Sequence, residues 1–184
     1  MSHLTPTLDR ARLVETLTLV LDHGPPQGEV PYRLVGTGAA LLHGVDLPVG
    51  DIDLLLVDRA GVDAFCAALA PFKCLEPATW LSEARQYYAN YLVNGVEVGL
   101  STVEIETESD AIETYGSGPW ELHYSLLPCG PYQVPTVDLE LRLITELYRA
   151  HLREHGCDLA LVRHGLSGGW LPQDRVESVL RQLV

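Results

Sequence analysis

The sequence predicts an α/β (α+β) protein: a mixed sheet flanked by helices, followed by a small helical tail. Before residue 104, segments with helical periodicity alternate with short apolar runs of the kind that form strands. Asn94-Gly95 stands between two such runs, where an Asn-Gly pair is a strong signal for a β-hairpin. Further segments with helical spacing follow residue 136. We therefore expect a core domain over residues 1–135 and a helical C-terminal subdomain over residues 136–184.

Each expected element follows from its periodicity and from the turn residues beside it. Apolar side chains recur at helical spacing over 8–23, and a glycine- and proline-rich stretch ends that helix. The strand at 51–57 is a nearly continuous apolar run, which is typical of a central strand buried on both faces. The expected helices are 8–23, 39–43, 59–69, 137–154, 157–164 and 174–183. The expected strands are 32–35, 51–57, 86–93, 96–103 and, shorter, 122–126. The expected turns and loops are 36–38, 44–50, 104–119 (a weak helix being the alternative) and 128–135.

The net charge of −13 is the strongest compositional feature. It disfavours attraction to nucleic-acid phosphates or anionic lipids, and only 12 Lys and Arg side chains are available for a local basic groove. The sequence has no apolar run of the roughly 18 residues that a membrane span needs, and its N-terminus does not resemble a secretory signal. Four widely separated cysteines argue against a zinc ribbon or a disulfide scaffold. We therefore expect a cytoplasmic protein that binds neither a membrane nor nucleic acid.

Two acidic side chains stand on one expected strand. Asp51 and Asp53 are two residues apart, so both side chains point to the same face. Their repulsion and partial burial would push one carboxyl towards protonation, and a divalent cation such as Mg²⁺ would remove that cost. Glu97, just after the Asn-Gly turn, is the candidate for a third acid on a neighbouring strand. The alternative is that the pair is a solvated strand end and Glu97 an exposed hairpin residue.

Gly36, Thr37 and Gly38 join the expected strand 32–35 to the expected helix 39–43. Glycine lets the backbone approach a ligand closely, and the free N–H groups at the start of a helix favour a phosphate. The Thr37 hydroxyl adds another donor, although it would also serve as a helix cap. These three residues are therefore the candidate phosphate-binding residues.

Together these motifs resemble the nucleotidyltransferase superfamily, whose sheet is related to that of DNA polymerase beta. The family pattern is an apolar residue, Gly, and Gly or Ser, followed after a spacer by an Asp-apolar-Asp or Glu motif. Here the corresponding residues are Val35-Gly36-Thr37 and Asp51-Ile52-Asp53, and Glu97 matches a third acid on a later strand. The stretches 34–45 and 134–140 are similar to prokaryotic minimal nucleotidyltransferases of unassigned substrate.

The sequence departs from the family pattern at three places. Thr37 stands where Gly or Ser is usual, which keeps a hydroxyl. Leu47 and Val49 occupy positions where many relatives carry Arg-x-Thr, so a cation that would steady a triphosphate is absent from that loop. Some relatives place the third acid where this chain has Gly99, which shares a strand face with Glu97.

The resemblance implies transfer of a nucleoside monophosphate from a nucleoside triphosphate to an acceptor, which is either a small molecule or a macromolecule. It implies two Mg²⁺ ions, with Mn²⁺ as the alternative, held by the catalytic residues Asp51, Asp53 and Glu97. It also implies that Gly36 and Thr37 hold the β and γ phosphates. The competing hypothesis is a catalytically inactive binding or regulatory module of the same fold, such as one component of a toxin–antitoxin pair. Leu47, Val49 and Gly99 favour that alternative, whereas the Gly-Thr pair and the Asp pair favour the enzyme.

Overall fold

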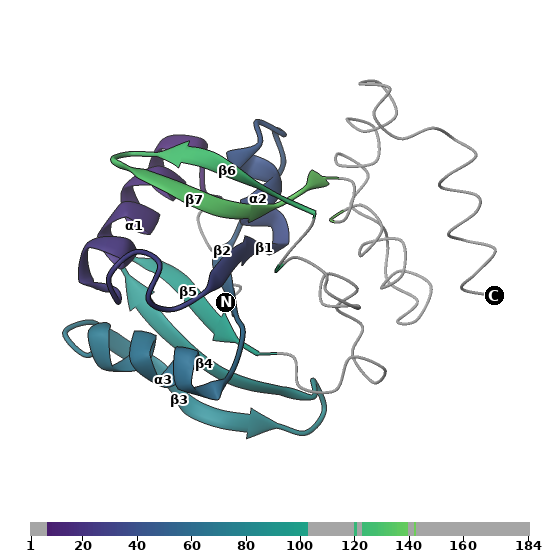
Figure 1. Cartoon of the computed structure of the whole chain (residues 1–184). Helices are drawn as coiled ribbons and strands as arrows, with labels where there is room; N and C mark the ends of the chain where they lie inside the picture. Colours follow the sequence, from purple (N-terminus) through teal and green to yellow (C-terminus); the bar gives the residue numbers. More distant parts are fainter. Residues whose placement is uncertain (1–6, 103–119, 121–122, 140–141, 143–184) are drawn as a thin grey trace.

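A computed structural model of the chain describes residues 7–102, 120, 123–139 and 142 (Figure 1). The expected loop at 104–119 and the expected helices at 157–164 and 174–183 lie outside the described residues. Most of the expected helix at 137–154, and with it the helical subdomain over 136–184, lies outside them too. Among the described helices, none is long and apolar enough to cross a membrane.

Seven strands form one mixed sheet in the order β3-β4-β5-β2-β1-β7-β6. The strands are β1 (Tyr32–Val35), β2 (Asp51–Leu56), β3 (Lys73–Leu81), β4 (Gln86–Val93), β5 (Val96–Ser101), β6 (Tyr124–Cys129) and β7 (Tyr132–Val137). β2 pairs in parallel with β5, β1 pairs in parallel with β7, and the other neighbours are antiparallel. The β6–β7 hairpin and the β3–β4 hairpin lie at opposite ends of the sheet (Figure 1). The structure thus confirms the predicted mixed sheet, with β2 at its centre.

Three helices are described, α1 (Arg10–His23), α2 (Gly36–Leu42) and α3 (Arg59–Ala68). Side chains cap the two longer ones: Asp9 accepts a 2.7 Å hydrogen bond from the Arg12 N–H, and Asp58 accepts one of 2.8 Å from the Gly61 N–H. Each cap satisfies a backbone donor that the first turn of a helix leaves without a partner. The expected positions of α1 and α3 are therefore confirmed to within two residues at each end.

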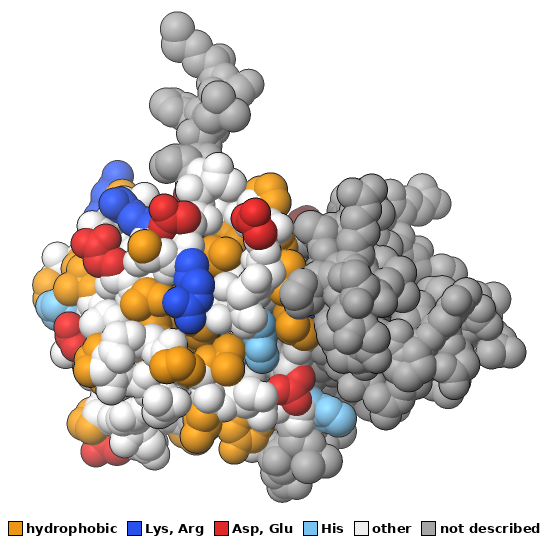
Figure 2. All heavy atoms as spheres, turned by 90° about the horizontal axis from the view of Figure 1, so that it is seen from above, with side chains coloured by type: hydrophobic (Ala, Val, Ile, Leu, Met, Phe, Trp, Pro, Cys, Tyr) orange, Lys and Arg blue, Asp and Glu red, His pale blue; other side chains and the backbone are white. Residues whose placement is uncertain are grey.

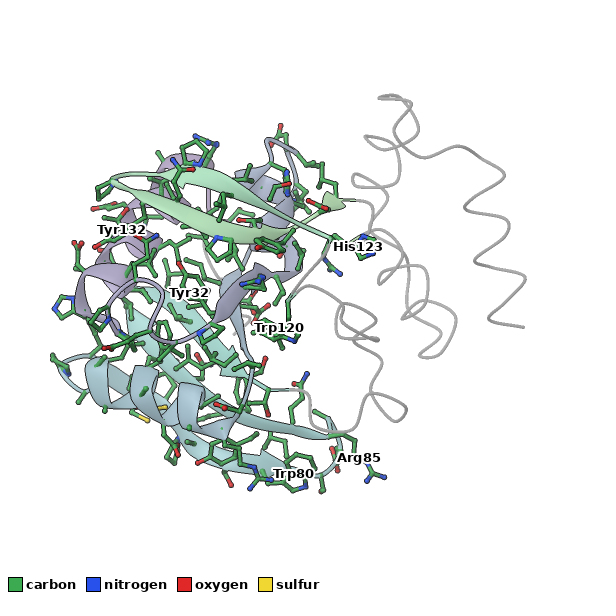
Figure 3. All side chains as sticks on the ribbon, viewed as in Figure 1. Tyr32, Trp80, Arg85, Trp120, His123 and Tyr132 are labelled. Carbon is green, nitrogen blue, oxygen red and sulfur yellow. The ribbon has the colours of Figure 1, made fainter. Side chains whose placement is uncertain are left out.

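The helices pack against one face of the sheet. Phe65 of α3 meets Tyr32 of β1 edge to face, with the ring centroids 5.8 Å apart (Tyr32 is labelled in Figure 3). The two residues belong to a buried core that includes Leu13 and Leu17 of α1. On β2 the side chains on this face are fully or almost fully buried, and they are Ile52, Leu54 and Leu56. Since successive side chains of a strand alternate, Asp51 and Asp53 point to the other face.

The predicted hairpin at Asn94-Gly95 is confirmed. Both residues have positive φ, 51° and 74°, as a two-residue type I′ turn requires. The Arg12 guanidinium of α1 donates a hydrogen bond to the Asn94 carbonyl, which fixes the turn to the helix layer. The turn also sets the register of β4 on β5, because it pairs Val93 with Val96.

Three elements differ from the sequence-based prediction. The strand β3 (Lys73–Leu81) was not predicted, and it is an edge strand in which no residue is buried. The predicted turn at 128–135 is wrong, since β6 runs to Cys129 and β7 begins at Tyr132. Proline lacks the N–H of a ladder bond, but Pro128 lies on the edge strand β6, where this is tolerated. β7 was not predicted, and it ends at Val137, where the sequence predicts the start of a helix.

Candidate functional site

The parallel pairing of β2 with β5 brings the predicted acids to one face of the sheet. Asp51 pairs with Glu97, and Asp53 pairs with Gly99. Paired residues on neighbouring strands project their side chains to the same face, so Glu97 joins Asp51 and Asp53 there. Asp51 and Glu97 are exposed, whereas Asp53 is half-buried. The three acids therefore come from the centre of the sheet, on the face away from the helices.

The Asp53 carboxylate lies between two glycines. A Cβ added to Gly36 would stand 2.7 Å from Asp53 Oδ2, and a Cβ added to Gly99 would stand 2.8 Å from Asp53 Oδ1. Both distances are shorter than carbon and oxygen tolerate. Gly36 also has a φ of 68°, a conformation that other residues rarely adopt. Glycine at both positions is therefore required for the observed placement of Asp53.

Gly36 is the first residue of α2, so the prediction that residues 36–38 form a turn before a helix at 39–43 is wrong. The helix starts directly at the end of β1, and Val35, at its N-cap position, makes no side-chain capping bond. Thr37 is half-buried. Gly38 is buried, and a Cβ there would contact Leu13 of α1, so this glycine belongs to the core. Of the three predicted phosphate-binding residues, Gly36 is the one that the structure brings into contact with an acid.

Glu97 is held by the neighbouring strand β4. Asn90 Nδ2 donates a 3.0 Å hydrogen bond to Glu97 Oε2, and the Asn90 side chain is buried. The other amide atom, Asn90 Oδ1, is buried without a hydrogen-bond partner. Over the part of the chain that the structure describes, no three His, Cys, Asp or Glu side chains are grouped so as to hold a metal ion as they stand.

Comparison with solved structures shows what this fold is similar to. No protein-family model and no curated protein matches the sequence. The fold is similar to the crystal structure of a proposed nucleotidyltransferase from Thermotoga maritima, with a TM-score of 0.64 and 16% sequence identity. The similarity covers 90% of this chain and 99% of the other. The chain has a nucleotidyltransferase-like fold. In this structure Gly36, at the start of α2, and Gly99, on β5, flank the Asp53 carboxylate.

Leu47 and Val49 are core residues of this nucleotidyltransferase-like fold. Both are buried, with 5% and 0% of their surface exposed, in the loop that leads into β2. The Leu8 N–H donates a 2.7 Å hydrogen bond to the Val49 carbonyl, which ties the loop to the segment before α1. An arginine at position 47 would have to bury its charge there, so the departure from Arg-x-Thr has a packing reason.

Tyr88 lies beside the candidate site, although the sequence favours a core or rim aromatic at this position. Its ring carbon Cε2 would be 3.3 Å from a Cβ on Gly99, so the ring of Tyr88 lies over this glycine and beside Asp53. Desolvation, and then the charges of Asp53, Glu76, Asp51 and Glu97, raise the pKa of Tyr88 to about 12. The Asn94-Gly95 turn is enough to place Tyr88 on this face. The turn sets a register in which Tyr88 pairs with Ser101, and Ser101 lies on the same face of β5 as Glu97.

A basic side chain on the same face has a structural role. Arg33 of β1 is buried, and its guanidinium carbon lies 3.9 Å from the ring centroid of Tyr124 and 5.1 Å from that of Trp120. Its two terminal nitrogens donate to the carbonyls of Tyr32 and Trp120 at 2.7 and 2.8 Å. Burial lowers the pKa of Arg33, and the aromatic rings offset part of the desolvation. Arg33 thus connects the centre of the sheet to β6 and Trp120.

Basic side chains elsewhere do not form a single patch on the face that Figure 2 shows. There the few Lys and Arg side chains are interspersed with acidic and hydrophobic ones. Arg59 of α3 packs on the rings of Trp80 and Tyr87, with its guanidinium carbon 5.3 and 5.0 Å from their centroids. Trp80 lies at the β3–β4 end of the molecule, next to Arg85 (Figure 3). Trp80 and Tyr87 therefore pack against Arg59 at this end of the sheet.

The charge of Asp51 is expected to destabilise the metal-free protein. Desolvation, and then the negative charge of Glu97, raise the pKa of the Asp51 carboxyl above its ordinary value of 3.8. A raised folded-state pKa means that the folded protein binds more protons than the unfolded chain between the two pKa values, so stability falls as the pH rises through that window. Asp51→Asn is therefore expected to raise the melting temperature at pH 7 in buffer with a chelator.

The measurement is thermal unfolding at pH 7 and at pH 4, with Asp46→Asn as the control. Asp46 is an exposed acid of the preceding loop, so its variant removes the same charge from the chain. At pH 7 the rise in melting temperature caused by Asp51→Asn should exceed the rise caused by the control. At pH 4 the rise caused by Asp51→Asn should be smaller than at pH 7. Equal gains from both variants at pH 7 would show that only the total charge matters.

Proposed function

We propose that this protein is a Mg²⁺-dependent nucleotidyltransferase, which transfers a nucleoside monophosphate from a nucleoside triphosphate to an acceptor. One observation carries the proposal: the register of β2 on β5 places Asp51, Asp53 and Glu97 on one face of the sheet, where Asp53 lies against the first residue of α2. The similarity in fold to a proposed nucleotidyltransferase supports the reaction class.

The chemistry of the proposed ligands suits Mg²⁺, although the described side chains would have to move closer together to hold an ion. Asp51, Asp53 and Glu97 offer carboxylate oxygens, the hard ligands that Mg²⁺ prefers. The pKa of Asp51 is raised first by desolvation and then by the charge of Glu97, and a bound cation would oppose both effects. We propose Asp51 and Asp53 as the main ligands, with Glu97 completing the set; Mn²⁺ would suit the same oxygens. When bound, such ions neutralise phosphate charge and lower the pKa of an attacking hydroxyl.

The chain's own residues would orient the substrate. Gly36 brings the backbone at the start of α2 to within contact distance of Asp53, so phosphates placed there would meet free N–H groups of the helix. The half-buried Thr37 adds a hydroxyl donor at the same turn. Gly36 and Thr37 are therefore the proposed triphosphate-binding residues, while Gly38 serves the packing of α2 on α1.

The proposed partners are a nucleoside triphosphate and an acceptor that is either a small molecule or a macromolecule. The net charge of −13 argues against nucleic acid and mildly for a cationic acceptor. We place the reaction in the cytoplasm, on the sequence argument given above.

Calorimetric titration with ATP, GTP, CTP and UTP, with and without Mg²⁺, tests the proposal. We expect at least one triphosphate to bind in a Mg²⁺-dependent manner, and the variant Asp51→Asn/Asp53→Asn to lose this binding. Asp46→Asn/Asp63→Asn is a matched control, because both acids are exposed and lie outside the site. Failure of every triphosphate to bind well-folded wild-type protein would refute the proposal.

A second candidate is a binding or regulatory module that has lost catalysis, for example a toxin–antitoxin component. The hydrogen bond from Asn90 to Glu97 favours it, because this contact directs one oxygen of the third acid towards β4 and away from Asp51. Measuring the release of pyrophosphate distinguishes the enzyme from the inactive binding module. Triphosphate binding without turnover, in the presence of Mg²⁺ and a broad panel of acceptors, would favour the module.

A further inference from the structure

The hydroxyl of Tyr88 lies on the opposite side of Asp53 from α2. The point where a Cβ of Gly99 would stand is 2.8 Å from Asp53 Oδ1 and 3.4 Å from the Tyr88 hydroxyl oxygen. Both atoms therefore border the same small volume above Gly99. The other carboxylate oxygen, Asp53 Oδ2, faces Gly36 and the start of α2. A group bound at Asp53 would thus have backbone donors on one side and Tyr88 on the other.

Tyr88 differs from the neighbouring acids because its side chain can donate a hydrogen bond. Ionised carboxylates only accept hydrogen bonds, and so do the oxygens of a triphosphate, whereas a tyrosine hydroxyl has a proton to donate. The neighbouring Asn90 has two N–H donors on Nδ2, and it uses one of them on Glu97. Among the described neighbours of Asp53 on the β4–β5 side, Tyr88 is thus a donor that can face a phosphate oxygen.

We propose that Tyr88 contacts the substrate: its hydroxyl donates a hydrogen bond to a phosphate oxygen of the nucleoside triphosphate held beside Asp53. This inference rests on the proposed function, because it assigns one further contact in the same site. It makes Tyr88 a binding residue of the triphosphate, and it extends the site from β2 and β5 onto β4.

The chain supplies a matched control in the adjacent residue. Tyr87 precedes Tyr88 on β4, so its side chain points to the opposite face of the sheet. Its hydroxyl donates a 3.0 Å hydrogen bond to Asp63 Oδ1 of α3. Phenylalanine at either position keeps the ring and removes only the hydroxyl. Tyr88→Phe therefore removes a donor from the face of the acids, and Tyr87→Phe removes one from the face of α3.

The experiment compares wild type, Tyr88→Phe and Tyr87→Phe by calorimetric titration with the triphosphate that binds best, in saturating Mg²⁺. A hydrogen bond to a charged group is worth enough for a roughly tenfold change in affinity. We expect the Kd of Tyr88→Phe to rise about tenfold, the Kd of Tyr87→Phe to stay within twofold of wild type, and the ligand-free melting temperature of Tyr88→Phe to stay near that of wild type.

The outcomes separate this inference from the function on which it rests. A Kd of Tyr88→Phe within twofold of wild type would overturn the contact and leave the proposed function standing. An equal rise in Kd for Tyr88→Phe and Tyr87→Phe would also overturn the contact. The loss of affinity would then not depend on which face of the sheet loses its hydroxyl. Absence of triphosphate binding in the wild type itself would overturn the proposed function, and this contact with it.

Discussion

Gly99→Ala is expected to abolish tight triphosphate binding while leaving the protein folded. The added methyl group would stand 2.8 Å from Asp53 Oδ1 and 3.3 Å from the ring of Tyr88, so the carboxylate has to leave its observed position. Gly99 lies in a strand and has no positive φ, so its backbone suits alanine, and the close contacts are with two side chains that can shift. The backbone effect of replacing glycine by alanine is about 1 kcal/mol or less in the favourable direction, and displacing the side chains of Asp53 and Tyr88 opposes it. We therefore expect the Mg²⁺-dependent affinity to fall by an order of magnitude or more.

Gly50→Ala is the matched control for this effect. Gly50 directly precedes Asp51, yet a Cβ added there has no atom within 4 Å. Calorimetry and thermal unfolding on both variants decide the question. Gly50→Ala should bind as wild type does, and Gly99→Ala should melt near wild type but bind poorly. Wild-type affinity in Gly99→Ala would mean that the observed placement of Asp53 is not the one that binds substrate.

Local signals were sufficient to predict the elements that carry the acid pair. Asp51 and Asp53 interrupt an apolar strand at alternate positions, and this pattern is enough to place both on one face. The Asn94-Gly95 turn fixes β4 on β5 through backbone conformation alone. These features depend on neighbouring residues, so a single sequence contains them.

The pairing of β2 with β5 could not be predicted from local patterns. The two strands are separated by α3, β3 and β4, and their parallel register depends on packing across the whole sheet. The position of the Asp53 carboxylate between Gly36 and Gly99 depends on that register. The hydrogen bond from Asn90 to Glu97 depends on the position of β5 in the sheet as well. In the sequence Gly99 stands where some relatives of the resembled family carry an acid, and in the structure it leaves the space that Asp53 occupies.

The missed strands have physical reasons of their own. β3 lies at the edge of the sheet with no buried residue, so it has no apolar alternation to detect. The hairpin of β6 and β7 contains Pro128 and Pro135, which favour a turn locally, yet tertiary pairing holds both in strands. Sequence patterns therefore identify the central strands β1, β2, β4 and β5, and they miss the exposed edge strand β3 and much of the hairpin that contains the two prolines.

Phe65→Ala is expected to produce the largest loss of stability, about 3–5 kcal/mol of unfolding free energy. Phe65 is 1% exposed and is the largest fully buried side chain of the described core. Its ring packs on Tyr32 and comes close to Gly24 at the end of α1, so truncation leaves a cavity between two helices and the sheet. Urea unfolding measures the loss of unfolding free energy, and Phe72→Ala is the control. Phe72 is only half-buried, so its replacement by alanine should lower the unfolding free energy by less.

The same variant tests whether the two faces of the sheet serve separate purposes. Leu54 and Asp53 are adjacent in β2, yet one side chain enters the helix-covered core and the other belongs to the acid site. Phe65→Ala should therefore keep near wild-type triphosphate affinity at temperatures where it is folded, the reverse of Gly99→Ala. Weakened binding in a fully folded Phe65→Ala protein would mean that the helix layer sets the position of the carboxylates. In that case the strand register alone would not account for the site.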